Sequence, residues 1–128
     1  MSINERIISA IQRIAEDVES IGEIVKISEE YYFEYKEKYW SISRSREEVT
    51  GLHTHFFFYY PNTKLNLKGL AELASRGDPN THFMVFRETD FPRQRLAFRS
   101  LYDAIEAKYF GLDDALDDIL GKEPQIPF

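Results

Sequence analysis

The spacing of apolar residues predicts a helix near the start of the chain. Ser2 followed by Glu5 is a capping-box pattern, so we expect this helix to begin at Ile3. Its apolar residues recur at spacings of three and four and form one stripe: Ile7, Ile11, Ile14, Val18 and Ile21. Gly22 ends the pattern. The stripe favours packing of this helix on a sheet, with a dimer seam as the alternative.

Alternating residues predict strands in the next part of the chain. Within residues 23–46, Tyr31, Phe33 and Tyr35 share one parity, and residues 36–38 are a plausible hairpin turn. Residues 53–60 include five aromatic residues in a row. A strand that is apolar on both faces is a central strand covered on both sides, or a strand with one face covered by another subunit.

Helical patterns dominate the second half of the chain. Asn66 caps a short predicted helix, and a strand is expected over residues 82–88. Asp90 is expected to cap a longer helix that carries Pro92 in its first turn. A short acidic helix then follows, and its apolar residues are expected to face inward: Leu112, Leu116, Ile119 and Leu120.

These elements predict one α+β domain over residues 1–121, followed by a short C-terminal tail over residues 122–128. The predicted order is α-β-β-β-α-β-α-α, with the helices packed on a mostly antiparallel sheet. The connection between Tyr60 and Thr81 contains a helix and is long enough for a right-handed parallel crossover. That crossover would make the strands that start at His53 and His82 parallel neighbours.

Composition narrows the class of protein. The chain has 128 residues, of which 43% are hydrophobic, so it is long and apolar enough to bury a core and is not intrinsically disordered. It lacks an apolar run near the roughly 18 residues of a membrane span. It has no cysteine, which excludes disulfides, a thiolate zinc site and a cysteine nucleophile. The charged first twenty residues do not resemble a secretory signal, so we expect a cytoplasmic protein.

Charge disfavours nucleic acid as a partner. The formal net charge is −6, with acids in excess over residues 1–30 and 101–123, whereas duplex-binding proteins usually present a basic face. Residues 85–100 are locally basic. Arg93, Arg95 and Arg99 are therefore a candidate site for one phosphate or an acidic partner.

Aromatic residues carry the leading functional hypothesis. The chain has 8 Tyr, 10 Phe and 1 Trp, and each tyrosine hydroxyl needs water or a hydrogen-bonding partner. Core packing is one interpretation of these residues. The other is a half-exposed sheet that binds a protein partner or a second copy as a homodimer, and amphipathic aromatics favour such interfaces. The candidate interface residues are Tyr31, Phe33, Tyr35, Tyr39, Trp40 and Tyr59. On this hypothesis the protein is a small acidic interaction or regulatory module, without catalytic activity or cofactor.

Histidines offer the first alternative. His53 and His55 lie two apart and so point to the same face of a strand. If the crossover is parallel, His82 approaches them and completes a three-imidazole zinc site with an open position, as in metal-dependent hydrolases. The competing interpretation is that these side chains bond to backbone or water at strand ends.

A nuclease-like protein that processes nucleic acid is the second alternative. Glu34-Tyr35-Lys36 is an acid-x-Lys triplet, in which a carboxylate would help to hold Mg²⁺ and the lysine would stabilise charge, with Arg95 nearby for phosphate. Such triplets are also common on exposed strands as simple charge alternation. No Asp lies between Asp17 and Asp78 to supply the second carboxylate.

Overall fold

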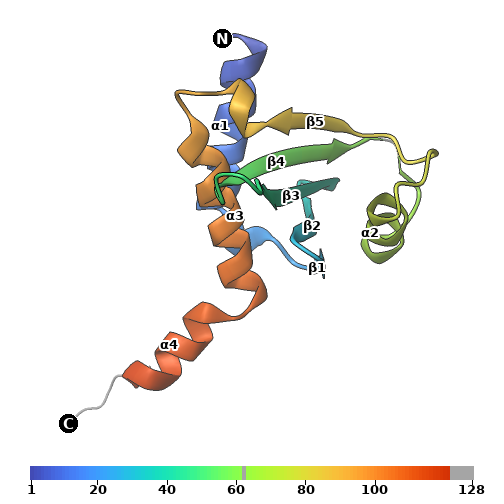
Figure 1. Cartoon of the computed structure of the whole chain (residues 1–128). Coiled ribbons are helices and arrows are strands. Elements are labelled where there is room, and N and C mark those ends of the chain that lie inside the picture. The colour runs from blue at the N-terminus through green and yellow to red at the C-terminus, as the bar shows by residue number, and fades with distance from the viewer. Residues whose placement is uncertain (62, 122–128) are drawn as a thin grey trace.

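The computed structural model describes residues 1–61 and 63–121, which form one α+β domain (Figure 1). Helices α1 and α3 pack together against one face of a five-stranded antiparallel sheet, and α2 packs on the other. The strands lie in sequential order: β1 (Ile24–Ile27), β2 (Glu30–Tyr35), β3 (Lys38–Arg46), β4 (His53–Tyr60) and β5 (Met84–Arg87). The helices are α1 (Ile3–Glu16), α2 (Leu67–Ser75), α3 (Arg95–Tyr109) and α4 (Leu112–Leu120), with 3-10 turns η1 (Val18–Ser20) and η2 (Glu88–Asp90).

The sheet has one strand more than predicted because a tight turn divides residues 23–46. Ser28 has a φ of 57°, and Ile27 pairs with Glu30, so β1 and β2 form a hairpin with a two-residue turn. Glycine or asparagine usually signals such a turn. The turn residues here are Ser28 and Glu29, which do not signal a turn. The alternation of residues therefore looks continuous from β1 into β2. The second hairpin turn is confirmed, since Lys36 and Glu37 have φ of 54° and 61°.

The predicted parallel crossover is wrong. β5 pairs with β4 in the antiparallel direction, with Tyr59 opposite Met84 and Phe56 opposite Arg87. After α2 the chain returns to the end of β4 that it had just left, so β5 runs back along β4. Every strand pair of the described sheet is therefore antiparallel.

The main core lies between the sheet and the α1–α3 pair. Tyr31, Phe33 and Tyr35 point from β2 to this side, as their shared parity predicts, but the helices cover them almost completely. Apolar residues of the helices meet them, including Ile11, Ile14, Phe98, Leu101 and Ile105. A smaller core on the opposite face joins α2 to the sheet, through Tyr32, Tyr60, Leu67, Leu70 and Ala71.

Two of the three predicted helix N-caps are confirmed. Ser2 Oγ accepts the Glu5 backbone N–H at 3.1 Å, and Glu5 Oε1 accepts the Ser2 N–H at 2.8 Å, which completes a capping box. Asn66 Oδ1 caps α2 at 2.8 Å from the Gly69 nitrogen. The long helix begins at Arg95 and has no side-chain cap. The aromatic ring of Phe91 is buried against α3, so the chain turns there before the helix can start.

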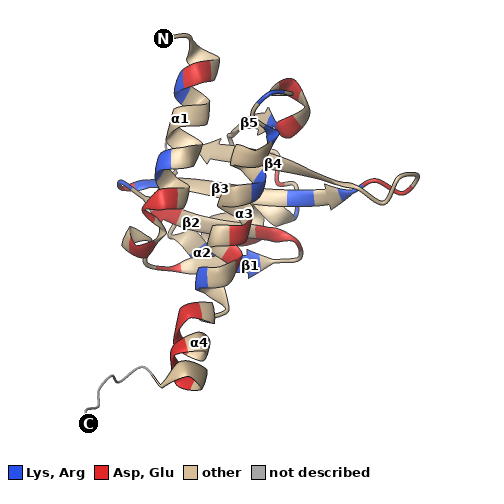
Figure 2. Cartoon of the chain, turned by 90° about the vertical axis from the view of Figure 1, so that its left-hand side faces the viewer, with Lys and Arg blue, Asp and Glu red and all other residues tan. Residues whose placement is uncertain are grey.

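Helix α4 departs from its predicted role. Gly111 has a left-handed φ of 67° and turns the chain, so α4 extends away from the sheet and contacts α3 (Figures 1 and 2). Its apolar residues, which were expected to face inward, are 44–79% exposed: Leu112, Leu116, Ile119 and Leu120. No helix in the described ranges is long and apolar enough to cross a membrane. The predicted tail over 122–128 lies outside the described residues.

The buried position of the β2 aromatics leads to a stability prediction. We expect Phe33→Ala to lower the free energy of unfolding by about 3–5 kcal/mol, because it removes a fully buried ring and leaves a cavity. Leu96, which is 71% exposed on α3, is the control, and Leu96→Ala should change stability by less than about 0.5 kcal/mol. Urea denaturation measures both values. Equal stability of the two variants would contradict this assignment of the core.

Candidate binding site

The sheet face that carries α2 is only partly covered. Helix α2 packs against β1 and β2, whereas Phe56, Phe58 and Val85 of β4 and β5 remain partly exposed on the same face. A pocket of about 400 Å³ lies at the edge of the area that α2 covers, between the sheet and the turn that follows α2 (residues 77–81). We take this pocket as the candidate site, because partly exposed aromatic residues line it.

Four aromatic rings form a continuous wall in this pocket. The Tyr32 and Tyr60 ring centroids lie 5.9 Å apart, and the Phe58 ring stacks on Tyr60 at 6.1 Å. Phe83 meets Phe58 edge-on at 5.4 Å. The two tyrosines are buried at the base, whereas Phe83 is 51% exposed at the rim. The wall therefore runs from the small core to the surface.

A carboxylate with three hydroxyl donors lies beside this wall. Tyr32 Oη donates to Glu30 Oε1 at 3.0 Å, and Ser41 Oγ donates to Glu30 Oε2 at 2.5 Å. Tyr60 Oη donates to the same Oε2 at 3.3 Å. The strands determine this cluster, since Tyr32 and Ser41 are cross-strand partners and Ser41 lies opposite Phe58, two residues before Tyr60.

The tyrosines of this cluster keep their protons. Burial raises the pKa of Tyr32 well above its ordinary value, and the Glu30 charge raises it further. Burial and Glu30 likewise raise the pKa of Tyr60. Both phenols are therefore neutral hydrogen-bond donors to Glu30, and neither is suited to act as a base at neutral pH.

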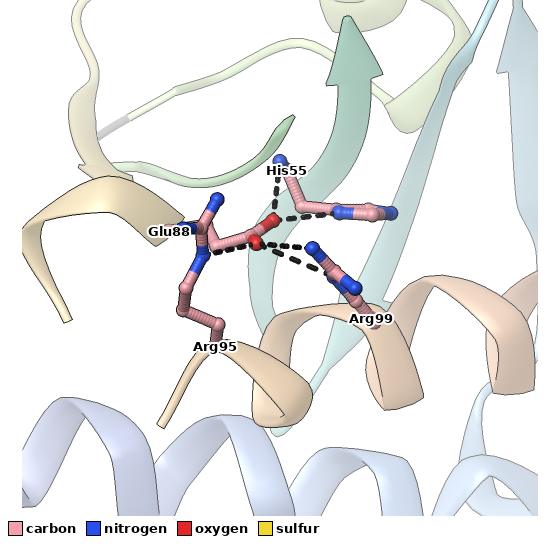
Figure 3. A network of polar contacts seen from close by, with 4 residues as sticks. All are labelled: His55, Glu88, Arg95 and Arg99. Carbon is pink, nitrogen blue, oxygen red and sulfur yellow. Dashed lines mark hydrogen bonds and ion pairs between the residues drawn. The ribbon is translucent and has the colours of Figure 1, made fainter. Parts of the chain in front are cut away.

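A second carboxylate, Glu88, is bound in a different way (Figure 3). Its side chain is fully buried, and Oε1 lies 2.9 Å from both the backbone nitrogen and Nδ1 of His55. Arg95 Nε donates to Oε2 at 2.7 Å, and Arg99 NH2 donates at 3.0 Å. The network thus joins β4, η2 and α3 through one buried charge.

The charge states in this network follow from its contacts. Burial alone would raise the pKa of Glu88, but hydrogen bonds from His55 and the two arginines outweigh it and lower the pKa to about 2. Burial lowers the pKa of His55, although Glu88 opposes this effect. At neutral pH a neutral imidazole therefore donates to an ionised Glu88. Because every acceptor has a partner, the network is suited to structural support.

The six candidate interface residues divide into two groups. Tyr31, Phe33 and Tyr35 are buried in the main core, so the expectation that they are half-exposed is wrong. The hydroxyls of the two tyrosines have internal acceptors, since Tyr31 donates to Glu106 and Tyr35 to Asp17.

The other three residues keep partial exposure: Tyr39, Trp40 and Tyr59. Trp40 stacks on Phe57 on the α1–α3 side, whereas Tyr39 packs with the small core on the α2 side. Their role at an interface stays a prediction.

The three histidines do not converge. His53 and His55 lie at the start of β4, but His82 precedes β5 and so lies beside the far end of β4, because the strands are antiparallel. His55 is instead part of the Glu88 network. Within residues 1–61 and 63–121, no group of three His, Cys, Asp or Glu side chains is placed to hold a metal ion, so the predicted zinc arrangement is not formed.

The other charged candidates lie apart from the pocket. Arg95 and Arg99, expected to bind an anion, share the internal carboxylate of Glu88, and Arg93 is exposed. Anion binding by these arginines stays a prediction, but part of the charge on which it relies is neutralised within the chain. Glu34 and Lys36 are exposed at the end of β2 and in the turn that follows.

Sequence reasoning missed the residues of the pocket. Tyr32, Ser41 and Phe58 have the parity opposite to that of Tyr31, Trp40 and Phe57, so alternation separated the two faces. It did not show which face the longer helices cover. Glu88 left a clearer signal, since Arg95 and Arg99 follow it on one side of a helix and can reach a single carboxylate.

Comparison of the chain with protein-family models, curated proteins and solved structures finds no match.

The Glu88 network predicts acid sensitivity. Glu88 stays ionised in the folded protein down to pH about 2 but protonates near 4.5 when unfolded, so the unfolded state binds more protons as pH falls. The lowered pKa of His55 acts in the same direction below its ordinary value of 6.5. Glu88 should contribute about 3 kcal/mol above pH 4.5, and this contribution is lost toward pH 2.

Urea denaturation at several pH values tests this prediction. Glu88→Gln should lower stability at pH 7 by about 3 kcal/mol and reduce the further loss in acid. Glu34→Gln, which removes an exposed carboxylate, is the matched control and should resemble the wild type. A Glu88→Gln protein that is as stable as the wild type at pH 7 would contradict the assignment.

Proposed function

We propose that this protein is a binding module that receives a segment of a partner protein on the open part of the α2-side sheet face. The observation that carries the proposal is the pocket with its partly exposed aromatic wall. Phe83 contacts Phe58 and extends the apolar surface from the pocket toward β5, which is an edge strand. Exposed aromatics around a pocket are typical of the centre of a protein interface.

Charge favours a partner that is positively charged at the point of contact. Glu30 and Asp78 line the pocket, and its described lining contains no lysine or arginine. Together with a net charge of −6, this lining repels the phosphates of nucleic acid. The same argument favours a different protein over a second copy, because a two-fold dimer through this face would bring two acidic pockets together.

The proposal includes a cytoplasmic location. Small domains built for oxidising compartments commonly carry disulfides, and this chain has no cysteine.

Peptide selection tests the proposal. A random peptide library displayed against the wild-type protein should yield peptides that bind the open face. Phe83→Ser should weaken their binding by about tenfold, because it removes an aromatic contact of the rim. Leu96→Ser, which changes an apolar residue on α3 that is 71% exposed, is the control and should leave binding unchanged.

Two results would contradict this docking surface. One is a set of selected peptides whose affinity is the same for wild type and Phe83→Ser. The other is sedimentation equilibrium showing a wild-type dimer that Phe83→Ser dissociates, which would make a second copy the occupant.

A further inference from the structure

We propose that the pocket beside α2 recognises a primary ammonium group, the side chain of a lysine on the partner segment. This inference rests on the proposed function for the source of the lysine. Its chemical basis is separate and lies in Glu30, in the four aromatic rings and in the charges that surround them.

Glu88 and Glu30 are both removed from bulk water, Glu88 fully and Glu30 in part. Glu88 forms ion pairs with two arginines and a hydrogen bond with a histidine. Glu30 is matched by three hydroxyls, and no cationic side chain in the described part of the chain forms an ion pair with it. A carboxylate removed from bulk water is stabilised by an opposite charge. None of the described residues supplies this charge to Glu30, so a bound cation would complete the site.

The aromatic wall beside Glu30 favours a cation as the ligand. The faces of tyrosine and phenylalanine rings attract cations, and the attraction strengthens where water is excluded. The rings of Tyr32, Phe58, Tyr60 and Phe83 line the same pocket as Glu30. The hydrocarbon stem of a lysine can pack along these rings while its ammonium group reaches the carboxylate. The volume of about 400 Å³ lies in the usual range for small-ligand sites.

The hydrogen bonds of Glu30 favour an ammonium group over a guanidinium group as the ligand. Both oxygens of Glu30 already accept hydroxyl protons, from Tyr32 on one side and from Ser41 and Tyr60 on the other. A guanidinium binds a carboxylate best as a two-pronged fork and would compete with these donors. An ammonium is a compact point charge that needs a single remaining lone pair. Asp78, in the turn after α2, supplies a second negative charge at the rim.

NMR titration of the full chain with Nα-acetyl-lysine N-methylamide tests the inference. Saturable shifts are expected at Gly77 and Phe83, which line the pocket. Acetylation of the Nε of the probe should weaken binding by at least about tenfold, because it removes the charge that meets Glu30. This comparison uses only the wild-type protein and so does not depend on the folding of a variant.

Two variants test whether the carboxylate of Glu30 is the group that binds the ammonium. Glu30→Gln keeps an oxygen for the hydroxyls and should weaken binding of the lysine probe by about tenfold. Glu34→Gln removes a carboxylate from the same strand and the same face but outside this pocket, and binding should be unchanged. Thermal unfolding of both variants checks that they are folded.

Several outcomes would overturn the inference. They are equal binding of the acetylated probe, no saturable shift at the pocket, or shifts that survive Glu30→Gln. A free diamine such as putrescine that binds far more tightly than the lysine probe would replace the partner lysine as the ligand. Selected peptides that depend on Phe83 but lack lysine and ignore Glu30→Gln would refute the inference while the proposed function stands.

Discussion

The five-stranded sheet of this protein has two apolar faces, and the helices cover these faces unequally. The α1–α3 pair spans one face and buries Phe33 and Phe57 completely or nearly so. The opposite face receives α2, which has nine residues and packs on β1 and β2. Burial of apolar surface is the main source of stability. The uncovered part of this sheet is apolar surface that a binding partner could still remove from water. The pocket and its aromatic wall lie at this boundary.

The acidity of the protein is connected with its buried tyrosines. A buried phenol needs an acceptor, and carboxylates at the borders of the core provide it. Tyr31 donates to Glu106 at 3.1 Å, and Tyr102 donates to Glu29 at 3.3 Å. On the other face of the sheet, Tyr32 and Tyr60 donate to Glu30 in the same way. The acidic excess is therefore partly structural, and among the described residues Glu30 has no cationic ion-pair partner.

Local patterns predicted local features well. The capping box at Ser2, the Asn66 cap and the turn at Lys36 depend on neighbouring residues, and the α+β class follows from the order of the elements. The direction of β5 and the exposure of α4 depend on contacts between distant segments, so the alternation of residues did not reveal them. For the candidate site, parity separated the two faces of the sheet but did not show which one stays open.

Hydroxyl-radical footprinting read by mass spectrometry measures the central claim, that one sheet face is closed and the other is partly open. The account predicts fast oxidation of Phe83, slower but measurable oxidation of Phe58, and strong protection of Phe33 and Phe57 in the folded protein. Oxidation of Phe33 and Phe57 as fast as that of Phe83 would contradict it, because the α1–α3 face would then be open to solvent.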